Sequence, residues 1–291
     1  MTSRNRRRLR TWGIAAAIVF AAYAAAAWYA AGELTAPVPR EVFLPKTGRD
    51  ISNIALETAA GRVAGWYVRP RRGPRGIAVL LHGVRGDRTQ MWPRADWLAG
   101  RGWASVLVDL PAHGESEGDA ITLGRRERHA ARAAVDFARE RHPDGPVAVV
   151  GVSLGGAATV LALADGPLDV DGLVLESVFP TVTAAVGNRT GRVPYVGGLL
   201  SRSLLVQMRP RLGVSPADLR PVDHLAAAGC PVLVLSGRLD DGTTPADTRR
   251  LFAAAAEPKA LHFFAAAGHE DLHAHSPEEY ERRVAAFLDG L

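Results

Sequence analysis

The residues with the clearest capacity for chemistry run from Gly151 to Gly155 and read Gly-Val-Ser-Leu-Gly. They follow an apolar run, Val147–Val150, that is typical of a buried strand, and they precede an alanine-rich stretch at 157–164 that is typical of a helix. A serine between a strand and a helix sits on a sharp turn, where crowding requires small residues two positions before and two after it. The turn points the hydroxyl away from the sheet, in front of a helix N-terminus. We therefore interpret Ser153 as a candidate nucleophile.

A serine hydroxyl is a weak nucleophile unless a base takes its proton. With the nucleophile in this position, the acid and then the histidine are expected later in the chain. His269 follows the apolar run Leu261–Phe264 and is the candidate base. Asp240 follows the run Val232–Leu235 and is the favoured acid, which would hold the tautomer of the histidine and stabilise its imidazolium form. Both residues lie in loops after strands, where a parallel sheet places its ligand crevice.

Two other acidic residues compete for the role of Asp240. Asp241 lies four residues before Pro245, at a spacing that also suits the acid, and it is the alternative. Glu176 directly follows an apolar run at 172–175, but it precedes the irregular segment that interrupts the fold. We favour Asp240 because it lies at the exit of its strand.

The oxyanion site is expected near the pair His82-Gly83, which ends the central apolar run Ile77–Leu81. Backbone N–H groups beside such a turn and directly after the nucleophile can stabilise a developing oxyanion, so the candidate donors are Val84 and Leu154. His82 itself is an alternative base. It precedes the serine, however, and a structural role in shaping the loop fits it better.

The elements that must position these residues are short apolar runs that alternate with helical stretches, which predicts a mostly parallel sheet covered on both faces. At 291 residues, 47% hydrophobic and 22% charged, the chain is neither disordered nor a polytopic membrane protein. Strands are expected at 41–45, 51–58 and 62–69 (an antiparallel opening set), 77–81, 105–110, 147–150, 172–175, 232–235 and 261–264, and helices at 89–100, 125–141, 154–164, 245–256 and 277–289. Residues 180–229 are too long for an ordinary connection and are predicted to form a small helical cap.

The N-terminus carries five arginines and no acid in residues 1–10, followed by 22 uncharged residues from Thr11 to Gly32. About 20 apolar residues span a bilayer core, and the positive-inside rule places the basic tail in the cytoplasm and the rest outside it. Ala30-Ala31-Gly32 would also serve as a signal-peptide cleavage site, which would make the protein secreted. Residues 33–40 are expected to be a linker, and 41–291 the catalytic domain. We favour an uncleaved single-pass anchor.

Without the tail, residues 11–291 hold 30 basic and 30 acidic side chains, since five of the 35 basic residues lie in the tail. A nucleic-acid-binding domain needs a basic face, so this balance argues against that class. The single cysteine, Cys230, excludes an internal disulfide framework and a cysteine-based metal site.

The segment from His269 to His273 (His-Glu-Asp-Leu-His) also matches the H-E-x-x-H signature of zinc peptidases. That interpretation needs both histidines on one face of a helix. Gly268 and Pro277 closely flank the segment and oppose a continuous helix. The longer form of the motif would need glycine at position 276 and histidine at position 279, where serine and glutamate stand. We therefore keep zinc chemistry only as an unfavoured alternative.

Taken together, these motifs resemble those of the α/β-hydrolase superfamily, particularly its esterases and acyl-peptidase-like serine hydrolases. They are His82-Gly83, Asp109-Leu-Pro-Ala-His-Gly-Glu-Ser-Glu-Gly118, Gly151-Val-Ser-Leu-Gly-Gly156, Gly237-Arg-Leu-Asp240 and Gly268-His269, in that order. The resemblance covers roughly 41–291. It implies an α/β-hydrolase fold with about eight strands, a triad of Ser153, Asp240 and His269, and a 109–118 loop that borders the site. His113 and Ser116 are expected to scaffold that loop.

The function expected from these features is hydrolysis of an ester or thioester through an acyl-enzyme, by an enzyme anchored to a membrane. A peptide or amide hydrolase of the same fold is the alternative within this class. A non-catalytic binding protein of this fold would be marked by a broken triad, whereas all three residues are present. The expected partners are a small-molecule or lipid-like acyl substrate and the membrane, and no cofactor is implied because a triad and an oxyanion site suffice.

Overall fold

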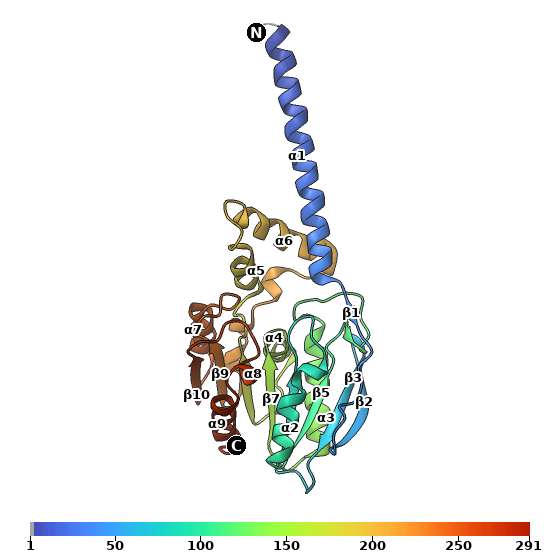
Figure 1. The fold of residues 1–291 in the computed structure, drawn as a ribbon, viewed down its shortest axis with the longest axis vertical. Helices are drawn as coiled ribbons and strands as arrows, with labels where there is room; N and C mark the ends of the chain where they lie inside the picture. The colour runs from blue at the N-terminus through green and yellow to red at the C-terminus, as the bar shows by residue number, and fades with distance from the viewer. Residues whose placement is uncertain (1–2) are drawn as a thin grey trace.

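The computed structural model describes residues 3–291, whose centre is a mixed sheet of eight strands (Figure 1). Across the sheet the strands are β2 (Asp50–Thr58), β3 (Gly61–Arg69), β5 (Trp103–Val108), β4 (Gly76–Leu81), β7 (Val147–Val152), β8 (Gly172–Glu176), β9 (Val232–Gly237) and β10 (Lys259–Phe264). β3 is antiparallel to both β2 and β5, and all other neighbours are parallel. The prediction of a mostly parallel sheet of about eight strands is confirmed.

Helices cover both faces of this sheet, so that its central strands are buried on both sides. Apart from the N-terminal helix and the cap, the helices are α2 (Trp92–Gly100), α3 (Glu127–Arg141), α4 (Leu154–Ala162), α7 (Pro245–Ala254), α8 (Leu272–His275) and α9 (Pro277–Leu288), with 3-10 turns η1 (Arg88–Met91) and η2 (Leu163–Asp165). α3, α4 and α7 enclose one core, whereas α2 and α9 enclose the other. The continuous apolar runs of the sequence therefore correspond to strands with two buried faces.

The expected strand at 41–45 is wrong, because these residues form no strand. The segment carries Pro45, which has no N–H for a ladder, and the N–H of Val42 donates to the carboxylate of Glu115 (3.3 Å) instead of to a neighbouring strand. The nearest extended segment is β1 (Val38–Pro39), which pairs with β6 (His113–Gly114) in a separate two-stranded sheet. That pairing ties the chain after the N-terminal helix to the 109–118 loop.

The N-terminal helix α1 (Ser3–Thr35) projects away from the folded body (Figure 1). Its part from Arg10 to Thr35 is long and apolar enough to cross a membrane, by length and composition. The first three residues of the expected linker, 33–35, belong to this helix. Near its C-terminal end, Ala27 and Ala31 are buried, so this end of α1 packs against the body of the protein.

The segment 180–229 forms a group of helices between α1 and the sheet (Figure 1). It contains α5 (Val182–Thr190) and α6 (Gly197–Leu212), followed by the 3-10 turns η3 (Pro216–Asp218), η4 (Pro221–Asp223) and η5 (Leu225–Ala228). α5 packs against α6, and α6 in turn packs against α1. The N-terminal helix therefore packs on the cap, and its last residues also accept hydrogen bonds from Arg85 and Ile121 outside the cap.

Candidate active site

Ser153 lies on the turn between β7, which ends at Val152, and α4, which begins at Leu154. Its backbone has φ 47° and ψ −103°, a conformation that side-chain-bearing residues rarely adopt. A Cβ at Gly155 would lie 2.4 Å from the carbonyl oxygen of Leu81 on the neighbouring strand. A Cβ at Gly151 would lie 2.5 Å from the Cα of Gly156. The two flanking glycines are therefore required by close packing around a strained serine.

The structure brings Ser153, His269 and Asp240 together at the carboxyl ends of the strands. Ser153 Oγ lies 3.4 Å from Nε2 of His269, and Nδ1 of the same ring lies 2.9 Å from Oδ2 of Asp240. With Nδ1–H donating to Asp240, Nε2 carries the lone pair that can accept the serine proton. Distances in catalytic hydrogen bonds are often long before substrate binds, so 3.4 Å is compatible with that transfer.

Asp240 is fixed by its loop as well as by His269. Its side chain is completely buried, and its Oδ1 accepts hydrogen bonds from the N–H groups of Gly242 (2.9 Å) and Thr243 (2.6 Å). Burial alone raises the pKa of Asp240, but the hydrogen bonds from His269 and Thr243 outweigh it and keep the pKa below its ordinary value. Asp240 is therefore held as a carboxylate that faces the imidazole.

The two other candidate acids point elsewhere. The side chain of Asp241 is 67% exposed and pairs with Arg192 of the cap. Glu176 forms a buried ion pair with Arg94 (2.7 Å) on the α2 side of the sheet, while its backbone carbonyl accepts a hydrogen bond from the N–H of Ser153. Of the three candidates, only Asp240 contacts His269 in the described part of the chain.

Two buried histidines hold the loop that carries Val84. His82 accepts from the N–H of Leu110 at Nε2 (2.9 Å), so its Nδ1–H donates to the carbonyl of Gly83 (2.7 Å). His113 accepts from the N–H of Arg85 at Nε2 (3.0 Å). The N–H groups of Val84 and Leu154 donate no hydrogen bond within residues 3–291. Both predicted oxyanion donors are therefore free, and His82 is a support of the loop rather than a partner of Ser153.

Burial lowers the pKa of His82 to about 3, aided by the nearby His113. The unfolded chain, with a histidine pKa of about 6.5, then binds more protons than the folded one, so stability falls as pH drops below 6.5. Between pH 7 and pH 5 this group alone costs about 2 kcal/mol of unfolding free energy. Denaturant unfolding measures this difference. Between pH 7 and pH 5, we expect the unfolding free energy of His82→Gln to fall by about 2 kcal/mol less than that of the wild type. Identical pH slopes in the two proteins would contradict the assignment.

The His-Glu-Asp-Leu-His segment does not form a zinc-binding helix in the described residues. α8 begins only at Leu272, so His269 precedes it and does not share a helix with His273. His273 instead pairs with Glu281 (3.1 Å) and packs on Tyr280. Within residues 3–291 no group of three or more His, Cys, Asp or Glu side chains is placed to hold a metal ion.

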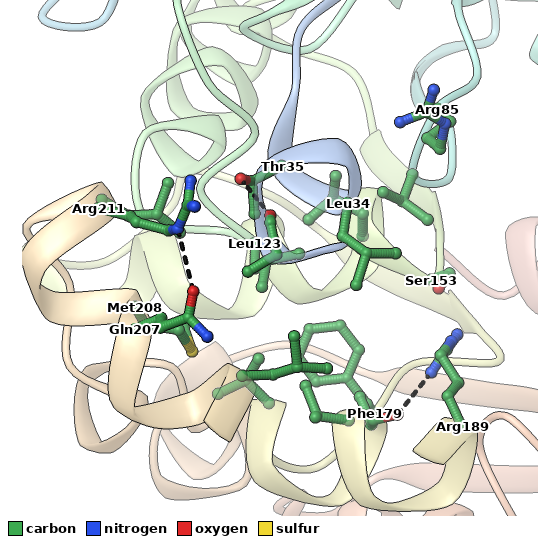
Figure 2. Close-up of a pocket in the computed structure, with 18 residues that line it drawn as sticks. Leu34, Thr35, Arg85, Leu123, Ser153, Phe179, Arg189, Gln207, Met208 and Arg211 are labelled. Carbon is green, nitrogen blue, oxygen red and sulfur yellow. Dashed lines mark hydrogen bonds between the residues drawn. The ribbon is translucent and has the colours of Figure 1, made fainter. Parts of the chain in front are cut away.

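A mostly apolar pocket opens onto Ser153, which lies at one end of it (Figure 2). Its walls come from the cap, from the Val84 loop and from the last turns of α1. The lining residues are Ala31, Leu34, Thr35, Val84, Arg85, Leu123, Ser153, Leu154, Phe179, Val182, Ala185, Val186, Arg189, Leu204, Gln207, Met208, Arg211 and Leu212. Most of them are apolar, so the pocket suits an apolar group attached to the reacting carbonyl. The charged ones are three arginines, which disfavour a cationic group.

Two parts of this site were not predicted from the sequence. Nη2 of Arg189 on α5 lies 3.4 Å from His269 Nε2, which places a cation beside the predicted base. Leu34 and Thr35 fall in the predicted linker, yet they line the pocket. The length of 180–229 predicts a cap, but no local pattern indicates where a cap or an anchor packs.

The sequence is similar to several known proteins. The family model of the serine aminopeptidase S33 hydrolases matches residues 72–222. The uncharacterized protein Rv2307c of Mycobacterium tuberculosis is 33% identical over 260 residues, which cover 88% of this chain and 82% of that protein. Monoglyceride lipase of Mus musculus is 27% identical over 113 residues, covering 38% of this chain and 37% of the lipase.

Among solved structures, the Pyrococcus furiosus esterase Pf2001 superposes with a TM-score of 0.69 and 18% identity, over 87% of this chain and 97% of the esterase. At that identity the likeness concerns the fold. The predicted α/β-hydrolase fold is confirmed by this superposition, by the family match and by the observed strand order.

Proposed function

Because the chain belongs to the serine aminopeptidase S33 family of α/β hydrolases, we propose that it hydrolyses carboxylic esters or thioesters through an acyl-enzyme on Ser153. The observation that carries this proposal is the chain of contacts from Ser153 through His269 to Asp240, together with the apolar pocket that Ser153 lines. A non-catalytic binding protein would not need a strained serine within reach of an oriented imidazole. A zinc peptidase would need the two histidines of its motif to share a helix.

In the proposed mechanism, Ser153 Oγ attacks the acyl carbonyl carbon while its proton moves to His269 Nε2. The carbonyl oxygen becomes an oxyanion, which the N–H groups of Val84 and Leu154 stabilise. The tetrahedral intermediate then expels the alcohol or thiol, which takes the proton from His269. Water then attacks the acyl-enzyme while one of its protons moves to His269 Nε2. The second tetrahedral intermediate releases the carboxylic acid, and His269 returns the proton to Ser153 Oγ. Asp240 remains ionised throughout and stabilises the imidazolium form of His269.

The pocket favours an ester over the substrate of an aminopeptidase. An aminopeptidase must accept a free ammonium group next to the scissile carbonyl, and a cation is recognised by an acidic group. The lining residues include Arg85, Arg189 and Arg211 but no aspartate or glutamate. A peptide or amide hydrolase that acts on a blocked, uncharged acyl group remains the second candidate, since it needs no ammonium site and the family description names a peptidase.

We further propose that α1 is an uncleaved signal anchor, with the basic tail in the cytoplasm and the catalytic domain outside it. The helix is long and apolar enough to span a bilayer. Cleavage after Gly32 would remove Ala31, which lines the pocket and is itself buried. Retention of the anchor therefore keeps this wall of the pocket intact.

A panel of substrates with one acyl group and different leaving groups tests the proposed reaction. Butyryl and octanoyl p-nitrophenyl esters, the corresponding thioesters, the anilides and an unblocked alanyl anilide are compared by kcat/KM. We expect both esters to be cleaved, the octanoyl ester faster because its chain extends farther into the apolar pocket, and the alanyl anilide to be the poorest substrate. Faster cleavage of the alanyl anilide than of either ester would overturn the assignment in favour of an aminopeptidase.

A further inference from the structure

The pocket that opens onto Ser153 is built partly from the proposed membrane anchor. Ala31, Leu34 and Thr35 of α1 line it, opposite residues of α5 and α6 (Figure 2). Leu34 points into the pocket in this view. The acyl-binding wall is thus continuous with the helix that would leave the bilayer, so the pocket must lie close to the membrane surface.

The cap helix α6 follows α1 toward the membrane beyond that point. The hydroxyl of Tyr23 lies 2.9 Å from that of Ser203, and the guanidinium of Arg211 lies 3.7 Å from the centre of the Trp28 ring. A span of about 20 residues that begins at Thr11 ends near Ala30. At 1.5 Å per residue, Tyr23 then lies about 10 Å inside the apolar layer. Because Ser203 contacts Tyr23, α6 must itself enter the outer part of that layer.

The solvent-facing side of α6 has the composition that such a position requires. Four residues of the helix are exposed and follow one another at intervals of three or four, so they form one face: Leu199, Arg202, Val206 and Arg209. The exposed Tyr195 lies just before the helix. Val206 is 75% exposed and Tyr195 is completely exposed. Apolar side chains interleaved with arginines are typical of helices that lie in a membrane interface, buried by about 5–10 Å.

The charge of the cap also favours a membrane surface. Residues 177–217 contain five arginines (Arg189, Arg192, Arg202, Arg209 and Arg211) and no acidic residue, in contrast to the balanced charge of the chain beyond the tail. Arg202 and Arg209 form no ion pair within the described residues. An arginine near an anionic lipid surface is attracted to it and strengthens binding. An anionic phospholipid leaflet therefore complements this face in both polarity and charge.

We propose that the outer face of α6 lies in the leaflet next to the catalytic domain, with its arginine side chains extending toward the lipid phosphates. The substrate is then an acyl ester of an amphiphile that passes from the leaflet into the pocket between α1 and α6, without crossing water. This inference rests on the proposed ester hydrolysis and on the retained anchor. It adds the source of the substrate and the part of the protein that receives it.

The position of α6 can be measured directly because Cys230 is the only cysteine. With Cys230→Ala as background, Val206→Cys and Ala253→Cys are labelled with an environment-sensitive NBD fluorophore in the full chain, reconstituted in phosphatidylcholine–phosphatidylglycerol vesicles. Ala253 is an exposed residue of α7, away from α1. We expect the label at 206 to emit at shorter wavelength and to resist aqueous iodide, and the label at 253 to remain quenchable. Equal quenching at both positions would overturn the proposal.

Activity distinguishes a failure of this inference from a failure of the proposed function. Val206→Asp and the control Ala253→Asp are assayed on soluble p-nitrophenyl butyrate and on a long-chain monoacylglycerol embedded in the same vesicles. We expect Val206→Asp to lower the rate on the embedded ester about tenfold, while the soluble ester is hydrolysed as by the wild type. Equal rates on the embedded ester in both variants would refute delivery from the leaflet. A wild-type protein that does not hydrolyse the soluble ester would instead refute the proposed function.

Discussion

Replacing Ser153 by alanine is expected to lower kcat/KM for the octanoyl ester by about 10⁴-fold or more. The serine oxygen forms the bond to the acyl group in the proposed mechanism, and no other hydroxyl is placed at Nε2 of His269 in the described residues. Steady-state hydrolysis by the wild type and by the variant, in detergent or vesicles, measures this difference. The KM of any residual activity should change little, because the pocket is left intact.

Ser105→Ala serves as the matched control for this prediction. Ser105 is buried in β5, and its hydroxyl forms no hydrogen bond within residues 3–291. Its removal should leave kcat/KM within about twofold of the wild-type value, since no partner is lost. A Ser153→Ala protein that retains more than a tenth of the wild-type rate while folding normally would rule out Ser153 as the nucleophile.

The second large effect is expected from Asp240→Asn, with the adjacent Asp241→Asn as its control. The amide at position 240 can no longer accept Nδ1–H as a carboxylate and favours the other tautomer of His269, so kcat should fall by about 10⁴-fold. Asp241 pairs with Arg192 at the surface, so its amide variant should remain within about twofold of the wild type. Both changes are isosteric, and they differ by one position in the chain.

The ratio of kcat in Asp240→Asn to kcat in Asp241→Asn identifies the residue that orients His269, without any assumption about the nucleophile. Equal, small losses in both variants would mean that His269 is oriented by another group. A large loss confined to Asp241→Asn would reverse the assignment. Circular dichroism and thermal unfolding of both variants exclude a trivial loss through misfolding.

The sheet and the turn at Ser153 could be predicted from the sequence because their causes are local. Uninterrupted apolar runs indicate strands buried on both faces, and the glycines around Ser153 are explained by contacts of less than 3 Å that any side chain would make. The order of serine, acid and histidine then indicated where each partner should follow a strand. These inferences required only the type and spacing of residues.

Other features depend on how distant segments meet, which no local pattern encodes. Asp240 and Asp241 are chemically identical neighbours, and the direction of each is set by the N–H groups of Gly242 and Thr243 and by Arg192 of the cap. The expected strand at 41–45 does not form, because Pro45 lacks an N–H for a ladder and the N–H of Val42 donates to Glu115 of a distant loop. The contribution of α1 to the pocket arises from its packing on α6, across more than 170 residues of sequence.

The most direct test of the central claim is covalent labelling of the full-length protein with a fluorophosphonate, followed by peptide mass spectrometry. An activated serine in a triad attacks phosphorus as it would a carbonyl carbon, so we predict one added phosphonyl group per chain, on the peptide that contains Ser153. Labelling should disappear in Ser153→Ala and His269→Ala and should be much slower in Asp240→Asn than in Asp241→Asn. A folded wild-type protein that remains unlabelled, or that is labelled at another residue, would contradict the account of Ser153 as an activated nucleophile.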